Sequence, residues 1–148
     1  MISTTETGTS WRARCIALSA LSLFLTAHAP FAASQEIRVA LSGNQEIPPI
    51  PTPASGAGTI NVDAERNMTG SATISGMTPT VAHIHEAPAG ANGPIVVPLI
   101  RTADNVWSVP PGTRLSEVQY KSFKAGNFYF NIHSEAHRSG EIRGQIKP

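Results

Sequence analysis

Apolar residues recur at every second position in several short segments of this chain, and this spacing constrains its fold more than any other feature. In one segment, Phe128, Phe130 and Ile132 are separated by more polar residues. Successive side chains on a β-strand point to opposite faces, so a period of two is typical of strands with one face in a core. The pattern recurs over residues 37–41, 59–63, 69–75, 128–133 and 142–146. The only helix that we predict is one short turn over 115–120, capped by Ser116.

Turn-forming residues separate these segments. Pro48 begins a proline-rich stretch after the first segment, where the missing N–H groups would interrupt a β-ladder. Asn67 lies at the predicted tip of a hairpin between the second and third segments, and loops are expected at 88–94 and 110–112. These signals predict one all-β domain of about seven to eight short strands, arranged as an antiparallel β-sandwich or a flattened Greek-key barrel.

Residues 1–34 have the pattern of a secretory signal peptide. Two arginines precede an apolar run over 15–29, and small residues lead up to Ser34. The apolar run is too short for a membrane-spanning helix. We therefore predict cleavage near Ser34, with an uncleaved N-terminal anchor as the alternative, and a single domain over 35–148. The expected location is periplasmic or extracellular, with no membrane attachment after cleavage.

The predicted mature domain has no cysteine and a balanced charge. The only cysteine of the chain, Cys15, lies in the leader, which excludes thiolate metal sites and disulfides from residues 35–148. Of the 11 basic and 10 acidic residues, two basic and one acidic lie in the leader, which leaves nine of each. This balance gives no electrostatic basis for binding nucleic acid or an anionic membrane.

All histidines of the predicted mature domain fall in two short motifs, one over 83–85 and one over 133–137. On a strand His83 and His85 share one face, and His133 points away from the core face of its own strand. Three or four neutral imidazoles without a thiolate suit Cu(II) or Zn(II) and are poor ligands for calcium or magnesium. The sequence therefore predicts one metal site, with copper as the first choice and zinc as the alternative. Its predicted ligands are His83, His85, His133 and His137.

The same histidines have a second interpretation, a hydrogen-bonded cluster that joins two strands without a metal. In that case the imidazoles would bind backbone groups and Glu86 or Glu141. With a metal, Glu86 and Glu135 could orient a ring or complete the ligand shell. Glu141 and Arg143 occupy alternate positions near the C-terminus and are expected to form a cross-strand salt bridge. Arg143 would guide an anion if it lay beside the metal.

The order and spacing of several motifs make this chain similar to a known family. These motifs include Ala82-His83-Ile84-His85 and cover residues 41–49, 56–59, 82–85, 92–96, 127–133 and 140–146. On these residues the chain resembles the CHRD domain, a module named for its occurrence in chordin and found widely in exported bacterial proteins. The resemblance implies a β-sandwich and offers His83, His85 and His133 as candidate ligands, but it brings no defined general activity. Glu86 stands where the family commonly has glycine, and His137 where another residue, often asparagine, is usual.

The stretch His83-Ile84-His85-Glu86 is also similar to the copper-ligand strand of Cu/Zn superoxide dismutases. The zinc-loop ligands and the disulfide cysteines of that family have no counterpart here. The expected fold is accordingly superoxide-dismutase-like or immunoglobulin-like. We expect a metal-binding or interaction module, with a copper-dependent enzyme of superoxide-dismutase type and a purely structural or adhesion domain as the alternatives. Binding is favoured over catalysis, and the expected partners are the metal ion and either another protein or a second copy of this chain.

Overall fold

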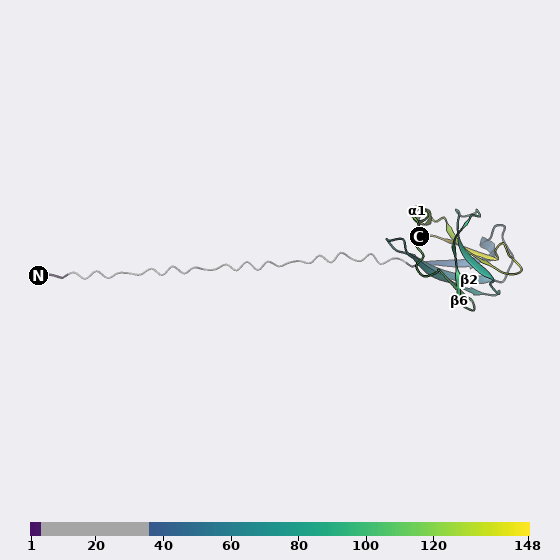
Figure 1. Cartoon of the computed structure of the whole chain (residues 1–148), viewed down its shortest axis with the longest axis horizontal. Helices are drawn as coiled ribbons and strands as arrows, with labels where there is room; N and C mark the ends of the chain where they lie inside the picture. The colour runs from purple at the N-terminus through teal and green to yellow at the C-terminus, as the bar shows by residue number, and fades with distance from the viewer. Residues whose placement is uncertain (4–35) are drawn as a thin grey trace. The chain divides into compact units, whose positions relative to one another are not determined.

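A computed structural model describes residues 1–3 and 36–148 of the chain (Figure 1). The predicted leader, apart from its first three residues, lies outside this described part, and so does its predicted cleavage site. Residues 36–148 belong to one compact unit, which contains the β-structure and the candidate site. The fold is therefore that of the predicted mature domain.

Nine strands in this part of the chain form one antiparallel sheet in the order β5-β4-β8-β9-β1-β2-β3-β7-β6. The strands are β1 (Ile37–Ser42), β2 (Ser55–Val62), β3 (Met68–Ser75), β4 (Val81–Glu86), β5 (Ile95–Pro98), β6 (Ile100–Ala103), β7 (Val106–Ser108), β8 (Phe128–His133) and β9 (Ile142–Ile146). The all-β prediction is confirmed, and so are strands at all five segments with alternating apolar residues. The number of strands exceeds the seven to eight expected, because residues 95–108 form three very short strands.

The connection between β5 and β6 shows that the sheet curls back on itself. β5 and β6 occupy opposite ends of the strand order, yet only Leu99 separates them in the chain. The backbone N–H of Leu99 donates a hydrogen bond to the carbonyl of Ala82 on β4, at 3.0 Å. A single residue can join the two edges only if the edges lie close together. The sheet is therefore a nearly closed, flattened barrel, which agrees with the predicted sandwich or barrel.

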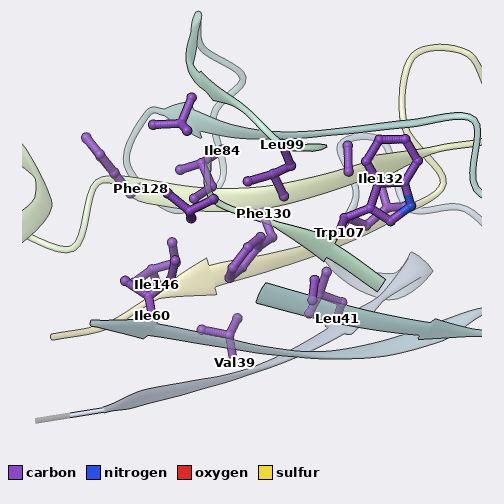
Figure 2. Close-up of a cluster of buried hydrophobic side chains, with 14 of the residues drawn as sticks. Val39, Leu41, Ile60, Ile84, Leu99, Trp107, Phe128, Phe130, Ile132 and Ile146 are labelled. Atoms are coloured by element: carbon purple, nitrogen blue, oxygen red, sulfur yellow. The ribbon is translucent and has the colours of Figure 1, made fainter. Parts of the chain in front are cut away.

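The apolar core fills the space between opposite walls of this barrel, as Figure 2 shows for side chains of β1, β4 and β8. Phe130 and Ile132 on β8 are fully buried, and Leu41 on β1 is nearly so. Gly58 on β2 makes room for the Phe130 ring, because a Cβ at this position would lie only 2.7 Å from the ring. A small residue thus faces a large one across the core, so that the walls can approach each other.

The single turn of helix predicted over 115–120 is a longer helix, α1 (Glu117–Lys124). It begins with a capping box: the Ser116 hydroxyl accepts from the Gln119 N–H at 3.1 Å, and the Gln119 side chain accepts from the Ser116 N–H at 2.8 Å. The predicted cap is confirmed. The helix extends further because Phe123 is buried against Phe128 at its C-terminal end, a contact that local sequence does not reveal.

Candidate metal centre

β4 and β8 carry three histidines on the same outer face of the barrel. The two strands pair antiparallel, with His83 opposite Asn131 and His133 opposite Val81. His83 and His133 are therefore diagonal neighbours, a relation in which long side chains of adjacent strands can meet. Ile84, between the two histidines of β4, points inward and is fully buried. The apolar core on the inner face thus fixes the direction of the imidazoles on the outer face.

The three imidazoles of His83, His85 and His133 converge. Each offers one nitrogen atom, and these three nitrogens lie within 4.8 Å of one another. Within the group, His83 Nδ1 and His133 Nε2 lie 3.1 Å apart. His133 is buried, while His83 and His85 are half-buried. Three of the four predicted ligands therefore form a group of the size that a single metal ion requires.

Backbone carbonyls determine which nitrogen of two of these rings carries the proton. His133 Nδ1 lies 2.9 Å from the carbonyl oxygen of Arg138, and His85 Nδ1 lies 2.9 Å from that of Gly93. A carbonyl only accepts, so both Nδ1 atoms carry hydrogen and both Nε2 atoms present a lone pair. His83 Nδ1 then donates to His133 Nε2. Hydrogen bonds of this kind orient the ring of a metal-binding histidine and select its ligand atom.

The Nε2 atom of His85 is buried and has no hydrogen-bond partner among the described residues. A buried polar atom without a partner costs about 1–3 kcal/mol, so an unsatisfied nitrogen in a native fold calls for an explanation. This atom is the one that the Gly93 hydrogen bond leaves free as a lone pair. The donor set fits a metal ion, because a cation would satisfy a nitrogen that the protein itself leaves without a partner.

Burial keeps all three imidazoles neutral. Desolvation, and then the charges of His133 and His85, lower the pKa of His83 to about 4. Desolvation also lowers the pKa of His85 and of His133, although the carbonyls of Gly93 and Arg138 partly offset it. Neutral imidazole is the form that binds a metal, so near neutral pH no proton has to be removed from a cationic ring.

His137 is not in the group of three converging ligands. Its backbone N–H donates to the Ser134 hydroxyl at 3.1 Å, and its carbonyl accepts from the N–H groups of Ser134 and Gly140. Its half-buried side chain interacts electrostatically with Glu141. His137 thus stabilises the turn over 134–140 that presents the carbonyl of Arg138 to His133. A direct ligand role for His137 stays a prediction.

The carboxylates expected around the histidines form no hydrogen bond with the three converging rings among the described residues. Glu135 forms an exposed ion pair with Arg138, and the Glu141 carboxylate accepts from the Thr52 hydroxyl at 2.6 Å. Among the described residues, no carboxylate is hydrogen-bonded to His83, His85 or His133, and the ring partners are backbone carbonyls instead. The expectation that Glu86, Glu135 or Glu141 orients one of these three rings was therefore wrong, whereas the backbone hydrogen bonds of the second interpretation are confirmed for His85 and His133. Sequence carries no signal for a carbonyl partner, because every residue has a carbonyl.

The salt bridge expected between Glu141 and Arg143 is also absent from the described part of the chain. Arg143 is only 2% exposed, and its Cζ lies 3.4 Å from the centre of the Tyr129 ring. Its guanidinium also donates to Asn92 and to the carbonyl of Ala91. A group so enclosed is not free to guide an anion from solvent.

These contacts belong to an outer polar layer on β4, β8 and β9, whose members are buried or half-buried. We define this layer as His83, His85, Tyr129, Asn131, His133 and Arg143, together with Glu46, which covers it from the loop after β1. The Asn131 amide donates to the Glu46 carboxylate. Burial raises the pKa of Glu46, and the Asn131 hydrogen bond and the charge of Arg143 partly offset this rise.

A cavity of about 310 Å³ adjoins the outer polar layer. Its walls include His85, Glu46, Asn131 and the Tyr129 ring, and apolar side chains such as Ile50 close another side. The cavity thus touches one of the three converging histidines. A metal held by three imidazoles keeps at least one position open, and this cavity provides space near the centre for a small ligand.

No helix of the described residues is long and apolar enough to cross a membrane.

Comparison with known proteins gives one clear result. The family model for the CHRD domain matches residues 37–146, a range that runs from the first residue of β1 to the last residue of β9. No curated protein and no solved structure matches the chain. The matched range contains the three converging histidines and the whole outer polar layer. This chain belongs to the CHRD domain family.

Proposed function

We propose that this protein is an exported metal-binding module that holds one copper ion, with zinc as the alternative metal, through His83, His85 and His133. The observation that carries the proposal is the convergence of three imidazoles, with one nitrogen of each within 4.8 Å of the others, beside a buried His85 Nε2 that has no partner among the described residues. The ligand atoms are Nδ1 of His83 and Nε2 of both His85 and His133. For His83 Nδ1 to bind a metal, the hydrogen bond between His83 and His133 would have to be given up, and the His83 proton would then be carried on Nε2.

The ligand chemistry favours copper. Imidazole suits copper, zinc, nickel and iron, and among divalent first-row ions copper binds nitrogen ligands most tightly. The group contains no carboxylate or carbonyl ligand of the kind that calcium and magnesium require. The signal-peptide pattern of residues 1–34 supports export of the mature domain from the cytoplasm. There the protein captures copper or uses the ion to stabilise a surface that contacts another protein.

The test begins with the full-length chain expressed with its leader and purified from the periplasmic fraction or the medium. Intact mass should show a chain that begins near Gln35, and recovery of uncleaved protein from the membrane fraction would contradict export as a free domain. Metal content and copper affinity are then measured by elemental analysis and by competition with a chelator. We expect one copper ion per chain, and at a free copper concentration of 100 times Kd we expect stabilisation by about 2.7 kcal/mol.

Matched variants show whether the site is the one proposed. The double variant His83→Ala/His133→Ala should lose at least a hundredfold in copper affinity. Val81→Ala changes an exposed residue on the same face of β4 and should keep the parent affinity. No copper or zinc in the parent, or unchanged binding in the double variant, would sink the proposal and favour a purely structural cluster.

A further variant decides the role of His137. In His137→Ala, copper affinity within a factor of about three of the parent value would mean that three histidines suffice. A loss of tenfold or more would make His137 the fourth ligand, recruited by movement of the turn over 134–140. Loss of stability without loss of affinity would assign it to the turn alone, where its backbone already lies.

The cavity beside His85 favours a second candidate function, a copper enzyme of superoxide-dismutase type, because such an enzyme needs room for a small ligand at the metal. Superoxide consumption by the copper-loaded protein well above that of free copper would support the enzyme. Consumption at or below that of the free ion would exclude it. The enclosure of Arg143 weighs against this candidate, since an exposed cation would otherwise draw the anion toward the site.

A further inference from the structure

Arg143 is a buried cation, and the proposed site does not use it directly. Its side chain is one of the largest that are fully buried in the described part of the chain. Arg143 takes part in none of the ion pairs that the described residues form. Removing a guanidinium from water without a paired carboxylate costs several kcal/mol, so its contacts must compensate for the lost hydration. The nearest carboxylate interaction is a longer-range electrostatic one with Glu46.

The contacts of Arg143 lead to the histidine cluster along two routes. The first route is a stack of planar groups. The guanidinium lies over the Tyr129 ring, with Cζ 3.4 Å from the ring centre, and the His85 ring stacks on Tyr129 at 5.0 Å with an interplanar angle of 13°. β9 and β4 flank β8 on opposite sides, so Arg143 and His85 cover opposite faces of the Tyr129 ring. His85 is therefore held in place by Tyr129, which is held in turn by Arg143.

The second route runs through the loop over 87–94. Arg143 donates to the Asn92 side chain at 3.0 Å and to the Ala91 carbonyl at 2.8 Å. The next residue, Gly93, donates its N–H to the Tyr129 hydroxyl at 3.1 Å and accepts from His85 Nδ1 at 2.9 Å. Arg143 thus fixes the loop immediately before the carbonyl that selects the His85 tautomer.

We infer that Arg143 is a positioning residue of the metal centre, which fixes the ring and the Nδ1–H tautomer of His85 through Tyr129 and Gly93. The inference deepens the proposed function, because it explains how His85 Nε2 is kept as the ligand atom. The positive charge of Arg143 has a second effect. A buried cation repels a doubly charged copper ion more strongly than a singly charged one. Arg143 should therefore favour binding of Cu(I) over Cu(II) at this site.

The first readout needs no metal. In metal-free parent protein, ¹⁵N NMR of the imidazoles should show His85 protonated at Nδ1 alone. In Arg143→Gln this tautomer should give way to a mixture of both forms, because the stack and the loop lose their common anchor. Arg101→Gln is the matched control: Arg101 is half-exposed, lies on β6 and makes no contact with the histidines, so the tautomer should stay unchanged.

The second readout separates charge from geometry in the copper-loaded protein. In Arg143→Gln the ratio of Cu(I) to Cu(II) affinity should fall below that of the parent, because the buried positive charge is lost. Arg143→Lys keeps the charge but loses the planar fork that donates to Asn92 and Ala91 at once, so it should keep the ratio and not restore the single tautomer. Tyr129→Leu removes both the stack and the hydroxyl that accepts from the Gly93 N–H, and it keeps the Arg143 side chain, so it serves as a second variant if Arg143→Gln does not fold.

The outcomes distinguish this inference from the proposed function. If Arg143→Gln and Tyr129→Leu both keep His85 protonated at Nδ1 alone, Arg143 does not position His85 and the inference is wrong. If the parent binds neither copper nor zinc, the proposed function fails, and the tautomer measurement on the metal-free protein still decides the positioning role. If the ratio of Cu(I) to Cu(II) affinity is the same in the parent and in Arg143→Gln, the charge of Arg143 does not affect which copper ion is preferred.

Discussion

The two faces of β8 are both buried, but they are buried by different means. The inner face carries Phe128, Phe130 and Ile132, all fully buried in the core. The outer face carries Tyr129, Asn131 and His133, which are buried to almost the same extent. Apolar side chains need only to be removed from water, whereas polar ones need a partner at a fixed distance and angle. The inner face therefore governs stability, and the outer face adds directional contacts that can hold a metal.

This difference shows in the partners that each face needs. The inner face packs against side chains of β1, β2 and β4, which any well-packed apolar residues could supply. The outer face depends on particular atoms, such as the carbonyl of Gly93 for His85 and that of Arg138 for His133. A substitution on the inner face should therefore affect stability first, and a substitution around the outer face should affect metal binding first.

The largest effect should come from the inner face. Phe130→Ala removes a fully buried ring that packs against Gly58, and the cavity left behind should lower the free energy of unfolding by about 3–5 kcal/mol. Urea denaturation measures this loss, with the exposed Val118→Ala as the control that should change little. Copper affinity of the folded fraction should stay within about threefold of the parent value. A loss of affinity as large as that of the histidine double variant would contradict the division between the faces.

Gly93→Ala should lower stability less than Phe130→Ala does, but it should weaken copper binding more. A Cβ at Gly93 would lie 1.8 Å from the Glu86 carbonyl oxygen, so the loop must shift and the His85 hydrogen bond must lengthen. We expect a loss of about 2 kcal/mol in unfolding free energy and of at least tenfold in copper affinity. Gly90→Ala in the same loop is the matched control.

At Gly90 a Cβ would meet nothing within 4 Å, although its φ of +84° imposes some strain on alanine. This control should lose about 1 kcal/mol and keep the parent copper affinity. Denaturation and chelator competition on both variants test the pair. Equal loss of affinity in Gly90→Ala and Gly93→Ala would show that the loop acts as a whole and that the Gly93 carbonyl has no special part.

The smallest effect is a pH dependence of stability in the metal-free protein. Burial lowers the pKa of His83 from 6.5 to about 4, so between these values the unfolded chain binds more protons than the folded one. The contribution of neutral His83 to the free energy of unfolding should be fully present above pH 6.5 and decrease as the pH falls toward 4. The decrease should be on the order of 1 kcal/mol, because solvent partly screens the ring.

Thermal melts at several pH values measure this decline. The control is a variant with alanine at positions 83, 85 and 133, in which the decline over this range should be smaller. An equal decline in the variant and in the parent would assign it to other titrating groups and would contradict neutral burial of the imidazoles.

Much of the fold could be predicted from sequence. The alternation in 37–41 and 128–133 identified strands because a core on one face imposes a period of two. The strands of 95–108 could not be counted, since each is only three or four residues long and too short to show an alternating pattern. The curling of the sheet at Leu99 depends on the meeting of two distant edges, which leaves no local pattern.

The sequence by itself determined which residues could bind a metal. Alternation placed His83 and His85 on one face and His133 outward, because side-chain direction on a strand is a local property of the backbone. Only the tertiary structure decided that these three converge, that carbonyls rather than carboxylates orient the rings, and that Arg143 lies on Tyr129 rather than beside Glu141. Hydrogen bonds and stacking depend on distances between segments far apart in the chain, and the pairing of the strands and the path of the loops set those distances.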